Sequence, residues 1–496
     1  MAHNHGTISE QLDPLFNPKV VALIGASRDP ISVSGFISKN LMNEGFKGKI
    51  YLVNPNARSK IMGLETVNRL GQVNDPIDCA IFTIPAKDVL GAMEECVSQK
   101  VKTAIVISAG FGEVGEAGSN MEHELVRIAR KGGIRFTGPN CNGVYSAPPK
   151  FAGLFGPLRP LPGEIALVTQ GGSPGVVIHN LTHCRRRGLS RFVNVGDAAD
   201  LDISDFIKYY GEDSSTKAIM CYFEGLKDGR KFMEAVKHAS ETKPVIVMKG
   251  GTGETSQRVV ASHVGALAGS DRVVSAALRS SGAIRTDSLS RMFDIAIAFS
   301  TQPLPRGNRV GILTFGGGVA VQFMDQADRL SLSVPALDSE SINALNRLLP
   351  AYWSHGNPVD TTDGAVTENV VQICAQTLMK LEYVDILVVI GIGTMEGFTW
   401  LTGIKEIAKM GTDREINVAK LLAEMRSKYG KPVIGITIHA NEGSEVLKYL
   451  REDSGIPMYD EPQTAALALR AMLDYKDYLN RISKLTSAKT PLKKKL

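Results

Sequence analysis

The chain has 496 residues and a net charge of +5, so it is long enough for about three domains of roughly 150 residues each. The charge is mild and forms no basic stripe with interleaved aromatic residues, which argues against a nucleic-acid-binding protein. The six cysteines form no Cys-x-x-Cys pair, so we expect neither a disulfide scaffold nor a metal site. No apolar run reaches the ~18 residues of a membrane span, so we expect no membrane contact. Because the N-terminus also lacks the apolar core of a signal peptide, we expect a cytoplasmic protein.

Short runs of Val, Ile and Leu alternate with helix-length segments, a pattern that predicts an α/β fold with parallel sheets. The first group of predicted strands lies in residues 1–149 and is followed by a Pro- and Gly-rich stretch, 150–163, predicted to be a linker. The strands of this group are expected at 20–25, 49–54, 79–84 and 103–108.

Two further groups of strands follow, in residues 164–300 and 309–480, separated by a predicted linker at 301–308. Both open with a strand and a glycine cluster, TQGGSPG and TFGGGVA, which suggests two related halves. Residues 481–496 are polar and basic, and we expect a frayed tail. The predicted strands are 164–169, 191–196, 218–225 and 244–250 in the second group, and 309–315, 384–391 and 432–438 in the third.

A turn that begins at Gly25 follows the first strand directly, where a helix N-terminus can bind a phosphate. The turn lacks the Gly-x-Gly-x-x-Gly fingerprint, and the second strand ends in Asn54-Pro55 where an NAD-binding protein carries an acidic residue. A phosphate-bearing ligand other than NAD is therefore favoured, with Arg28 as a candidate phosphate partner. The alternative is a tight strand-to-helix turn that binds nothing.

The sequence Gly171-Gly-Ser-Pro-Gly175 matches the Gly-x-Ser-x-Gly elbow of serine hydrolases. However, Pro174 has no N–H to donate to an oxyanion, a loss that costs on the order of 100-fold in rate, and it disfavours the positive φ of an elbow at Ser173. We instead expect Ser173 to be the N-cap of a helix, with Pro174 at its first position. Gly171 and Gly172 would let the backbone approach a bound anion closely, which predicts a phosphate cradle.

His263 lies among Ser, Gly and Ala in the loop VVASHVGALAGSD, with too little bulk around it for core packing. A histidine that carries a phosphoryl group needs a carboxylate on its other ring nitrogen, and Glu224 at the end of a predicted strand is placed to provide one. Because ligands of parallel sheets gather at the carboxyl ends of strands, the cradle, Glu224 and His263 are expected to meet. The alternative is a surface histidine in a turn of small residues.

Several segments in this order resemble the ADP-forming acyl-CoA synthetases, relatives of succinyl-CoA synthetase: DPLFNPKVVALIGASRDP (13–30), SAGFGEVGEAG (108–118), GPNCNG (138–143), YFEGLKDGRKF (222–232), SHVGALAGSD (262–271) and GNPVD (356–360). The resemblance implies a Rossmann-like coenzyme A-binding domain followed by two flavodoxin-like ligase domains, with His263 transiently phosphorylated and Glu224 orienting it. It assigns the coenzyme A contacts to Gly25, Ala26, Ser27, Arg28, Asn54, Pro55, Ile84, Pro85, Ser108, Ala109, Gly110 and Phe111.

The chain departs from the family in four places. The turn at 169–175 usually carries Ser-Gln-Ser-Gly, the usual Gly-Asn-Lys-Ala-Asp is Gly196-Asp-Ala-Ala-Asp200 here, and Val264 replaces a common threonine. Tyr352, Trp353 and His355 stand where small residues are common, either to shape an acyl pocket or to pack at an interface.

No ATP-grasp module is recognisable in the sequence. The resemblance therefore implies an α-type subunit, with a β-type ATP-grasp partner that binds Mg-ATP/ADP in an α2β2 heterotetramer. The implied reaction joins a small carboxylate to coenzyme A, with ATP converted to ADP and phosphate through phosphorylated His263 and an acyl phosphate. Two alternatives stay open: a non-catalytic coenzyme A-binding or regulatory protein, and an acyl or carbamoyl transferase on the same fold.

Overall fold

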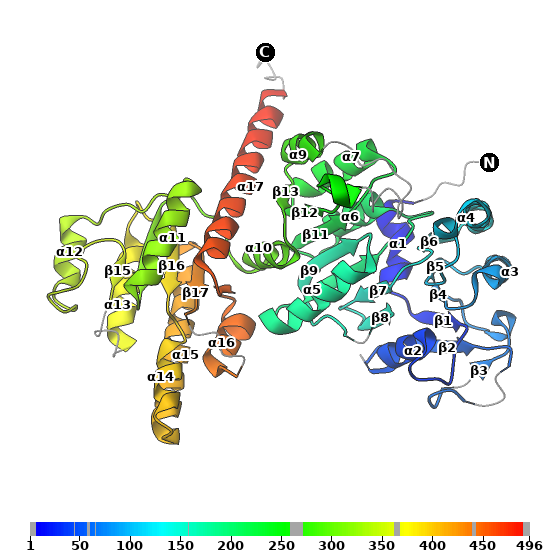
Figure 1. Ribbon diagram of the computed structural model, residues 1–496, viewed down its shortest axis with the longest axis horizontal. Helices are drawn as coiled ribbons and strands as arrows, with labels where there is room; N and C mark the ends of the chain where they lie inside the picture. The colour runs from blue at the N-terminus through cyan, green and yellow to red at the C-terminus, as the bar shows by residue number, and fades with distance from the viewer. Residues whose placement is uncertain are drawn as a thin grey trace, which may run out of the picture. The chain divides into compact units, whose positions relative to one another are not determined.

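The computed structural model describes residues 6–43, 45–56, 60–64, 66–156, 158–257, 271–361, 368–438 and 443–489. The chain divides into two compact units, Met1–His183 with Gly188–Met292, and Cys184–Arg187 with Phe293–Leu496. The first unit contains two sheets and the second unit contains one (Figure 1). No helix within the described ranges is both long enough and apolar enough to cross a membrane.

The first sheet is parallel throughout and has the strand order β3-β2-β1-β4-β5-β6 of a Rossmann fold. The order reverses between β1 and β4, so the ends of these two strands flank the crevice where such sheets bind ligands. Its elements are α1 (Ile8–Phe16), β1 (Val20–Ile24), α2 (Val33–Asn43), β2 (Lys49–Val53), β3 (Thr66–Val67), η1 (Leu70–Gln72), β4 (Cys79–Phe82), α3 (Ala86–Ser98), β5 (Thr103–Val106), η2 (Gly112–Val114), α4 (Glu116–Lys131) and β6 (Arg135–Thr137).

The second sheet has the order β13-β12-β11-β9-β10-β7-β8, in which β7 and β8 are antiparallel and the other five strands are parallel. The parallel part has the 2-1-3-4-5 order of flavodoxin, and its reversal point lies between β9 and β11. Its elements are β7 (Gly143–Ser146), β8 (Phe151–Leu154), β9 (Pro162–Thr169), α5 (Gly172–Arg185), β10 (Leu189–Asn194), α6 (Ile203–Glu212), β11 (Ala218–Phe223), α7 (Gly229–Ser240), β12 (Val245–Lys249), α9 (Asp271–Ser280), β13 (Ile284–Thr286) and α10 (Leu289–Thr301).

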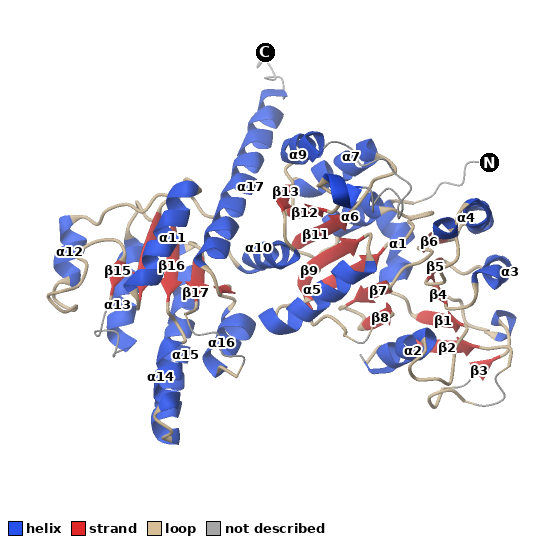
Figure 2. Ribbon diagram, in the orientation of Figure 1, coloured by secondary structure: helices blue, strands red, loops and turns tan. Residues whose placement is uncertain are grey.

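The sheet of the second unit repeats this flavodoxin order as β15-β14-β16-β17-β18, and helices lie along it (Figure 2). Leu387 and Val389 of β16 pack in one core with α13 and α15, while the alternate residues Val388 and Ile390 are also fully buried. Both faces are therefore covered, as expected for a parallel sheet. The elements are β14 (Val310–Thr314), α11 (Gly317–Arg329), α12 (Ser339–Leu345), β15 (Val359–Asp360), α13 (Glu368–Lys380), β16 (Ile386–Ile390), α14 (Thr394–Leu401), α15 (Lys405–Tyr429), β17 (Val433–Ile436), α16 (Glu445–Tyr449), η4 (Leu450–Ser454), β18 (Met458–Tyr459) and α17 (Pro462–Lys489).

A shared core explains why the first two sheets form one unit. Alternate residues of β1 face opposite sides: Ala22 packs with α3 and α4, whereas Val21 packs with α1 and α2. The core that contains Val21 continues into the second sheet, where it includes Val168 of β9 and Phe206 of α6. The two sheets thus share one continuous apolar interior.

The α/β prediction, with one Rossmann-like and two flavodoxin-like sheets, is confirmed, and each of the eleven predicted strand ranges overlaps a strand. The predicted linker at 150–163 was wrong in one respect, because it contains β8 and the start of β9. β8 is a four-residue strand whose pairing with β7 depends on a tertiary contact to β10, so its local sequence carries little signal. The position of the domain boundaries stays a prediction.

The basic tail also differs from expectation, since α17 continues through Lys489. Residues 481–489 contain neither Pro nor Gly and include the helix-favouring residues Leu, Lys and Ala, so nothing in them ends the helix.

Candidate functional site

Glu224 lies beside the turn between β9 and α5, at the reversal point of the second sheet. The side-chain oxygen of Gln170 accepts hydrogen bonds from the backbone N–H groups of Glu224 (2.8 Å) and Gly225 (3.0 Å). The N–H of Gln170 donates in turn to the carbonyl of Tyr222 at 3.0 Å. These three bonds join the carboxyl ends of β9 and β11 and fix the start of the Glu224 side chain next to the predicted cradle.

The glycines of the cradle are required by close approach of side chains. A Cβ on Gly171 would lie 3.3 Å from Oε1 of Glu224, and a Cβ on Gly172 would lie 2.7 Å from Oδ1 of Asn142. On the other side, a Cβ on Gly250 would lie 3.2 Å from Cγ of Glu224. Glycines from two separate turns therefore surround this carboxylate.

Helix α5 begins at Gly172, which corrects the prediction that Ser173 is its N-cap and Pro174 its first residue. Ser173 and Pro174 occupy the second and third helical positions instead. The first four N–H groups of a helix have no partner within the helix, so the proline still removes no helical hydrogen bond. Two neighbouring N–H groups, those of Gly172 and Ser173, belong to this first turn and suit an anion.

The hydroxyl of Tyr222 donates a 3.2 Å hydrogen bond to Oε1 of Glu224. Burial raises the pKa of Tyr222 to about 12, and the charge of Glu224 adds to this effect. Tyr222 therefore stays a hydrogen-bond donor across the physiological range and holds one oxygen of the Glu224 carboxylate.

His263 lies outside the described residues, as does the whole segment 258–270, so its predicted meeting with Glu224 stays a prediction. The residues on either side of this segment make polar contacts. Nζ of the buried Lys249 donates to the carbonyls of Gly250 (3.0 Å) and Gly251 (3.1 Å), and burial lowers the pKa of Lys249. At the far end, Asp271 is paired with Arg285 at 2.5 Å.

Two asparagines that the sequence analysis missed form hydrogen bonds that hold the residues before the predicted cradle in place. Nδ2 of Asn194 donates to the carbonyls of Thr169 (3.0 Å) and Gln170 (2.9 Å), while its Oδ1 accepts from the N–H of Asn142 at 2.7 Å. The available signal was an asparagine directly after the apolar pair Phe192-Val193, within a predicted strand.

The predicted coenzyme A residues lie at the carboxyl ends of β1, β2, β4 and β5, and hydrogen bonds join these ends. Nδ2 of Asn54 donates to the carbonyl of Ala26 at 2.7 Å, and the hydroxyl of Ser108 donates to the carbonyl of Ile84 at 2.5 Å. Gly25 has φ +94°, and a Cβ there would lie 2.7 Å from Cγ2 of Ile84. The structure thus brings Gly25, Ala26, Asn54, Ile84 and Ser108 together at one edge, with Ser27, Arg28, Pro55, Pro85, Ala109 and Gly110 adjacent in sequence.

Phe111 is one of the predicted coenzyme A residues, and its side chain is fully buried in the core with α3 and α4. Only its backbone faces the loop, and the carboxylate of Glu113 accepts hydrogen bonds from the N–H groups of Gly110 and, at 2.8 Å, Phe111. The sequence analysis did not single out Glu113.

In the second unit, Trp353 is buried, and its indole N–H donates to Oδ1 of Asn346 at 2.8 Å. Nδ1 of His355 lies 2.8 Å from the same oxygen, and the two rings pack at 4.9 Å. Trp353 is therefore packed inside the second unit, whereas Tyr352 and His355 are exposed, and both predicted roles of this stretch, an acyl pocket and packing at an interface, stay predictions.

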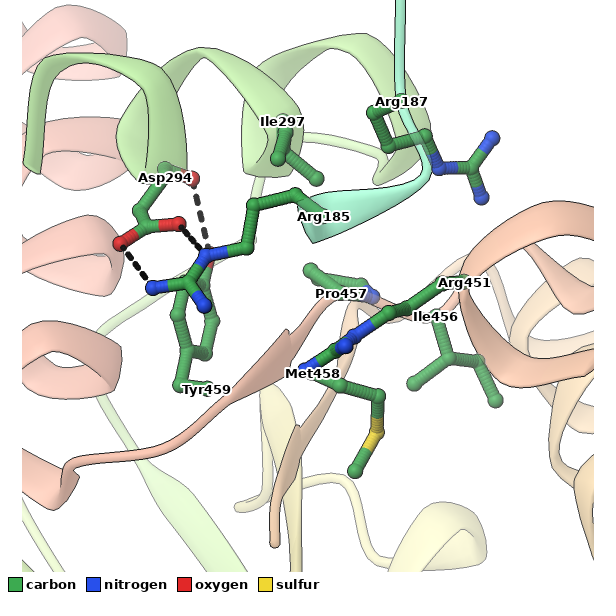
Figure 3. A pocket seen from close by; sticks show the side chains of 9 residues that line it. All are labelled: Arg185, Arg187, Asp294, Ile297, Arg451, Ile456, Pro457, Met458 and Tyr459. Carbon is green, nitrogen blue, oxygen red and sulfur yellow. Dashed lines mark hydrogen bonds and ion pairs between the residues drawn. The ribbon is translucent and has the colours of Figure 1, made fainter. Parts of the chain in front are cut away.

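A small cavity of about 10 Å³ lies in the second unit among arginine side chains (Figure 3). It has room for about one water molecule. Arg185 is paired with Asp294 (2.9 Å) and Asp460 (2.7 Å), so the charges here are structural. In the described part of the chain, no cluster of His, Cys, Asp and Glu could hold a metal ion. The cavity is lined by Arg185, Arg187, Asp294, Ile297, Arg451, Ile456, Pro457, Met458 and Tyr459.

Comparison with known proteins matches two family models, a CoA binding domain at residues 19–147 and a succinyl-CoA ligase like flavodoxin domain at residues 162–299. The chain is 38% identical to the α subunit of the ADP-forming acetate–CoA ligase I of Pyrococcus furiosus, covering 93% of this chain and 97% of that one. It is 35% identical to the ADP-forming acetate–CoA ligase I of Archaeoglobus fulgidus, covering 98% of this chain but 65% of that longer one. Among solved structures, the acetyl-coenzyme A synthetase 1 of Ca. Korarchaeum cryptofilum, in complex with phosphate and ADP, has a TM-score of 0.83 at 32% identity and covers 96% of this chain and 98% of that one.

Proposed function

The chain belongs to the ADP-forming acyl-CoA ligases, and from this membership we propose that it is the α-type subunit of such a ligase, acting through phosphorylated His263. The reaction would convert a carboxylate, coenzyme A and ATP into acyl-CoA, ADP and phosphate, and would be reversible. The observation that carries the proposal is the position of Glu224 beside Gly171 of the predicted cradle, at the reversal point of the second sheet.

The chemistry divides into three displacements at phosphorus and carbon. A ring nitrogen of His263 attacks the terminal phosphorus of ATP, and ADP leaves. A carboxylate oxygen of the substrate then attacks the phosphorus, which frees His263 and gives an acyl phosphate. Finally the thiolate of coenzyme A attacks the acyl carbon, and phosphate leaves. The covalent intermediates replace one difficult step with easier ones.

Each residue of the candidate site has a role in this scheme. Glu224 would accept a hydrogen bond from the second ring nitrogen of His263, which fixes the tautomer and balances the charge of the phosphorylated ring. The N–H groups of Gly172 and Ser173 at the start of α5 would bind the phosphoryl oxygens. Gln170 and Tyr222 hold Glu224 in position through the hydrogen bonds described above.

The first sheet would bind coenzyme A at the ends of β1, β2, β4 and β5, where its reversal point lies between β1 and β4. The matched CoA binding domain covers these strand ends. The thiol of the bound coenzyme A must reach the second sheet, and the shared core of the two sheets keeps their relative position constant.

A partner subunit is inferred from the relatives. The chain covers nearly all of a relative named as an α subunit but 65% of a single-chain relative, so about one third of the single-chain form has no counterpart here. We propose that a β-type ATP-grasp subunit provides that part and binds Mg-ATP, in an α2β2 assembly. The relatives are named for acetate, so a short carboxylate such as acetate is the first substrate to test.

The test combines the purified chain with its ATP-grasp partner and ATP labelled at the terminal phosphate. We expect an acid-labile label on the wild-type chain that His263→Ala abolishes, while replacement of the exposed His238 by Ala leaves it unchanged. Absence of label from the wild type, or undiminished label on H263A, would contradict the proposal. Coenzyme A binding without carboxylate-dependent ADP release would instead indicate a binding or regulatory protein, and acyl transfer to phosphate without nucleotide would indicate a transferase.

A further inference from the structure

A buried lysine, Lys249, ends β12 on the strand next to Glu224. β11 and β12 are paired in parallel as far as Phe223 and Lys249. The next residue on β11 is Glu224, and the next on β12 is Gly250. The N–H of Gly250 donates to the carbonyl of Phe223 at 2.8 Å. The turn of Gly250 and Gly251 therefore starts directly beside the predicted catalytic acid.

The side chain of Lys249 folds back over this turn. Its Nζ donates to the carbonyl of Gly250 at 3.0 Å and to the carbonyl of Gly251 at 3.1 Å. One side chain thus binds two consecutive peptide groups, and because a peptide group is planar and rotates as a unit, the bonds fix the orientation of both. Gly251 has φ +65°, the left-handed conformation in which the chain leaves the strand.

The surroundings of Lys249 do not favour a buried charge. Its side chain belongs to a residue that is 6% exposed, and within the described ranges no carboxylate is paired with it. Burial lowers the pKa of Lys249, the charge of Asp271 raises it, and the charge of Arg285 lowers it further. Asp271 is itself paired with Arg285 at 2.5 Å. Since an unpaired buried charge is costly, packing alone would favour an apolar side chain at this position.

The position of the turn matters to Glu224 because Gly250 lies against two side chains. A Cβ on Gly250 would lie 2.6 Å from the hydroxyl oxygen of Tyr222 and 3.2 Å from Cγ of Glu224. The same hydroxyl donates the 3.2 Å hydrogen bond to Oε1 of Glu224. A shift of Gly250 towards these side chains displaces the carboxylate, and a shift away removes the surface that they pack against.

We propose that Lys249 is a positioning residue for phosphoryl transfer: its ammonium group holds the turn of Gly250 and Gly251, and the turn keeps the Glu224 carboxylate in place. The inference rests on the proposed function, in which Glu224 orients His263. Loss of the ammonium group should slow the step that needs Glu224. It should leave the affinity for coenzyme A unchanged, because that site is assigned to the first sheet.

Lys249→Met keeps a side chain of similar length but removes the donor. The full chain is combined with its ATP-grasp partner, and transfer of the terminal phosphate label from ATP to the chain is followed in time. Transfer to K249M should be at least about tenfold slower than to the wild type, since a small misplacement of a catalytic group costs a large factor in rate. Calorimetric titration should give the wild-type affinity for coenzyme A.

Lys431→Met is the matched control. Lys431 is also buried, and its Nζ donates to the carbonyls of Met379 and Leu381, both at 2.8 Å. It precedes β17, at the amino end of that strand and in the other unit. K431M therefore loses the same kind of hydrogen bonds away from Glu224 and should keep the wild-type rate of label transfer. Thermal unfolding of both variants shows whether either change acts through stability.

A double-mutant cycle separates positioning from a general loss of structure. If Lys249 acts through Glu224, adding K249M to Glu224→Gln should slow transfer little further, because coupled residues are not additive. Gly250→Ala displaces the same turn with Lys249 intact and should slow transfer at least about tenfold. A wild-type rate in K249M or G250A would overturn the inference, as would an undiminished effect of K249M in the E224Q background.

Hydrogen exchange tests the turn without any activity. The N–H of Gly250 is bonded to Phe223, and its exchange in K249M should be on the order of tenfold faster than in the wild type, because the turn opens more often. Unchanged exchange would overturn the inference. If the wild type takes up no label in the presence of the partner, the proposed function fails. That failure does not alter the exchange result, which then decides alone whether Lys249 holds the turn.

Discussion

The backbone N–H of Glu224 donates a 2.8 Å hydrogen bond to the side-chain oxygen of Gln170, across the point where the strand order of the second sheet reverses. The residue that follows β9 therefore sets the position of the residue that follows β11. Because Gln170 also begins the turn into α5, one side chain links the predicted phosphate cradle to the acid that the sequence predicts for catalysis.

Replacement of Glu224 by Gln should slow phosphorylation of His263 by about 10²–10⁴-fold, since an amide cannot balance the charge of the phosphorylated ring. The rate is measured by label incorporation from ATP in the presence of the partner. Glu234 is exposed on α7, so Glu234→Gln is the matched control and should react at the wild-type rate. Equal rates for E224Q and the wild type would remove Glu224 from the mechanism.

A methyl group on Gly171 should reduce activity at least about tenfold without unfolding the protein, because its Cβ would lie 3.3 Å from Oε1 of Glu224 and displace that carboxylate. Steady-state turnover and thermal unfolding of Gly171→Ala together test this expectation. Gly91→Ala is the control, since a Cβ there meets no atom within 4 Å. It should leave turnover unchanged and stabilise α3 by up to about 1 kcal/mol.

Gly25→Ala should weaken coenzyme A binding at least about tenfold, because φ is +94° and the new Cβ would lie 2.7 Å from Cγ2 of Ile84. Gly63 has φ +82°, and a Cβ there would have no atom within 4 Å. Gly63→Ala therefore introduces backbone strain without crowding, and serves as the control. Calorimetric titration should show near wild-type binding for G63A. Similar losses in both variants would show that crowding against Ile84 is irrelevant.

The protein should lose stability in acid partly through His179 of α5. Its ring is buried against Phe192 at 4.5 Å, and burial lowers its pKa to about 4. An unfolded histidine has a pKa of about 6.5, so the unfolded state binds the proton first. The stabilisation is complete above about pH 6.5 and is lost as the pH falls towards 4, by about 3 kcal/mol in total.

Denaturant unfolding of wild type and His179→Leu at several pH values measures this contribution. The variant should show a shallower decline of unfolding free energy between about pH 6.5 and about pH 4. Replacement of the exposed His238 by Gln should not alter the slope. A variant with the wild-type slope would assign the acid sensitivity to other groups.

The longer strands could be predicted because a strand buried on both faces is a continuous apolar run, as in Val20–Ile24 and Ile386–Ile390. The strands that the analysis missed are those of two to four residues, such as Thr66–Val67 and Phe151–Leu154. Such strands are too short for periodicity, and partners distant in the sequence decide whether they form.

The residues of the candidate site differ in the same way: some have a local sequence signal, and others depend on partners distant in the sequence. Glu224 and the glycines stand at strand ends, a position that the chain pattern specifies. Asn142 and Asn194 act through partners 24 to 52 positions away, and only the folded chain brings those partners within hydrogen-bonding range. The start of α5 was misplaced by two residues because Ser and Pro suit several positions in a first turn.

The hairpin of β7 and β8 affects how this protein could have been assembled from parts during evolution. The hairpin follows the last strand of the first sheet, yet it pairs with β10 at the edge of the second, and Asn40 of α2 donates to the carbonyl of Leu154 at 2.9 Å. A gene break before residue 164 would separate β10 from its edge partner and expose an unpaired strand, which favours aggregation. The two sheets of the first unit are therefore expected to be inherited as one piece, and domain shuffling in this family should occur elsewhere along the chain.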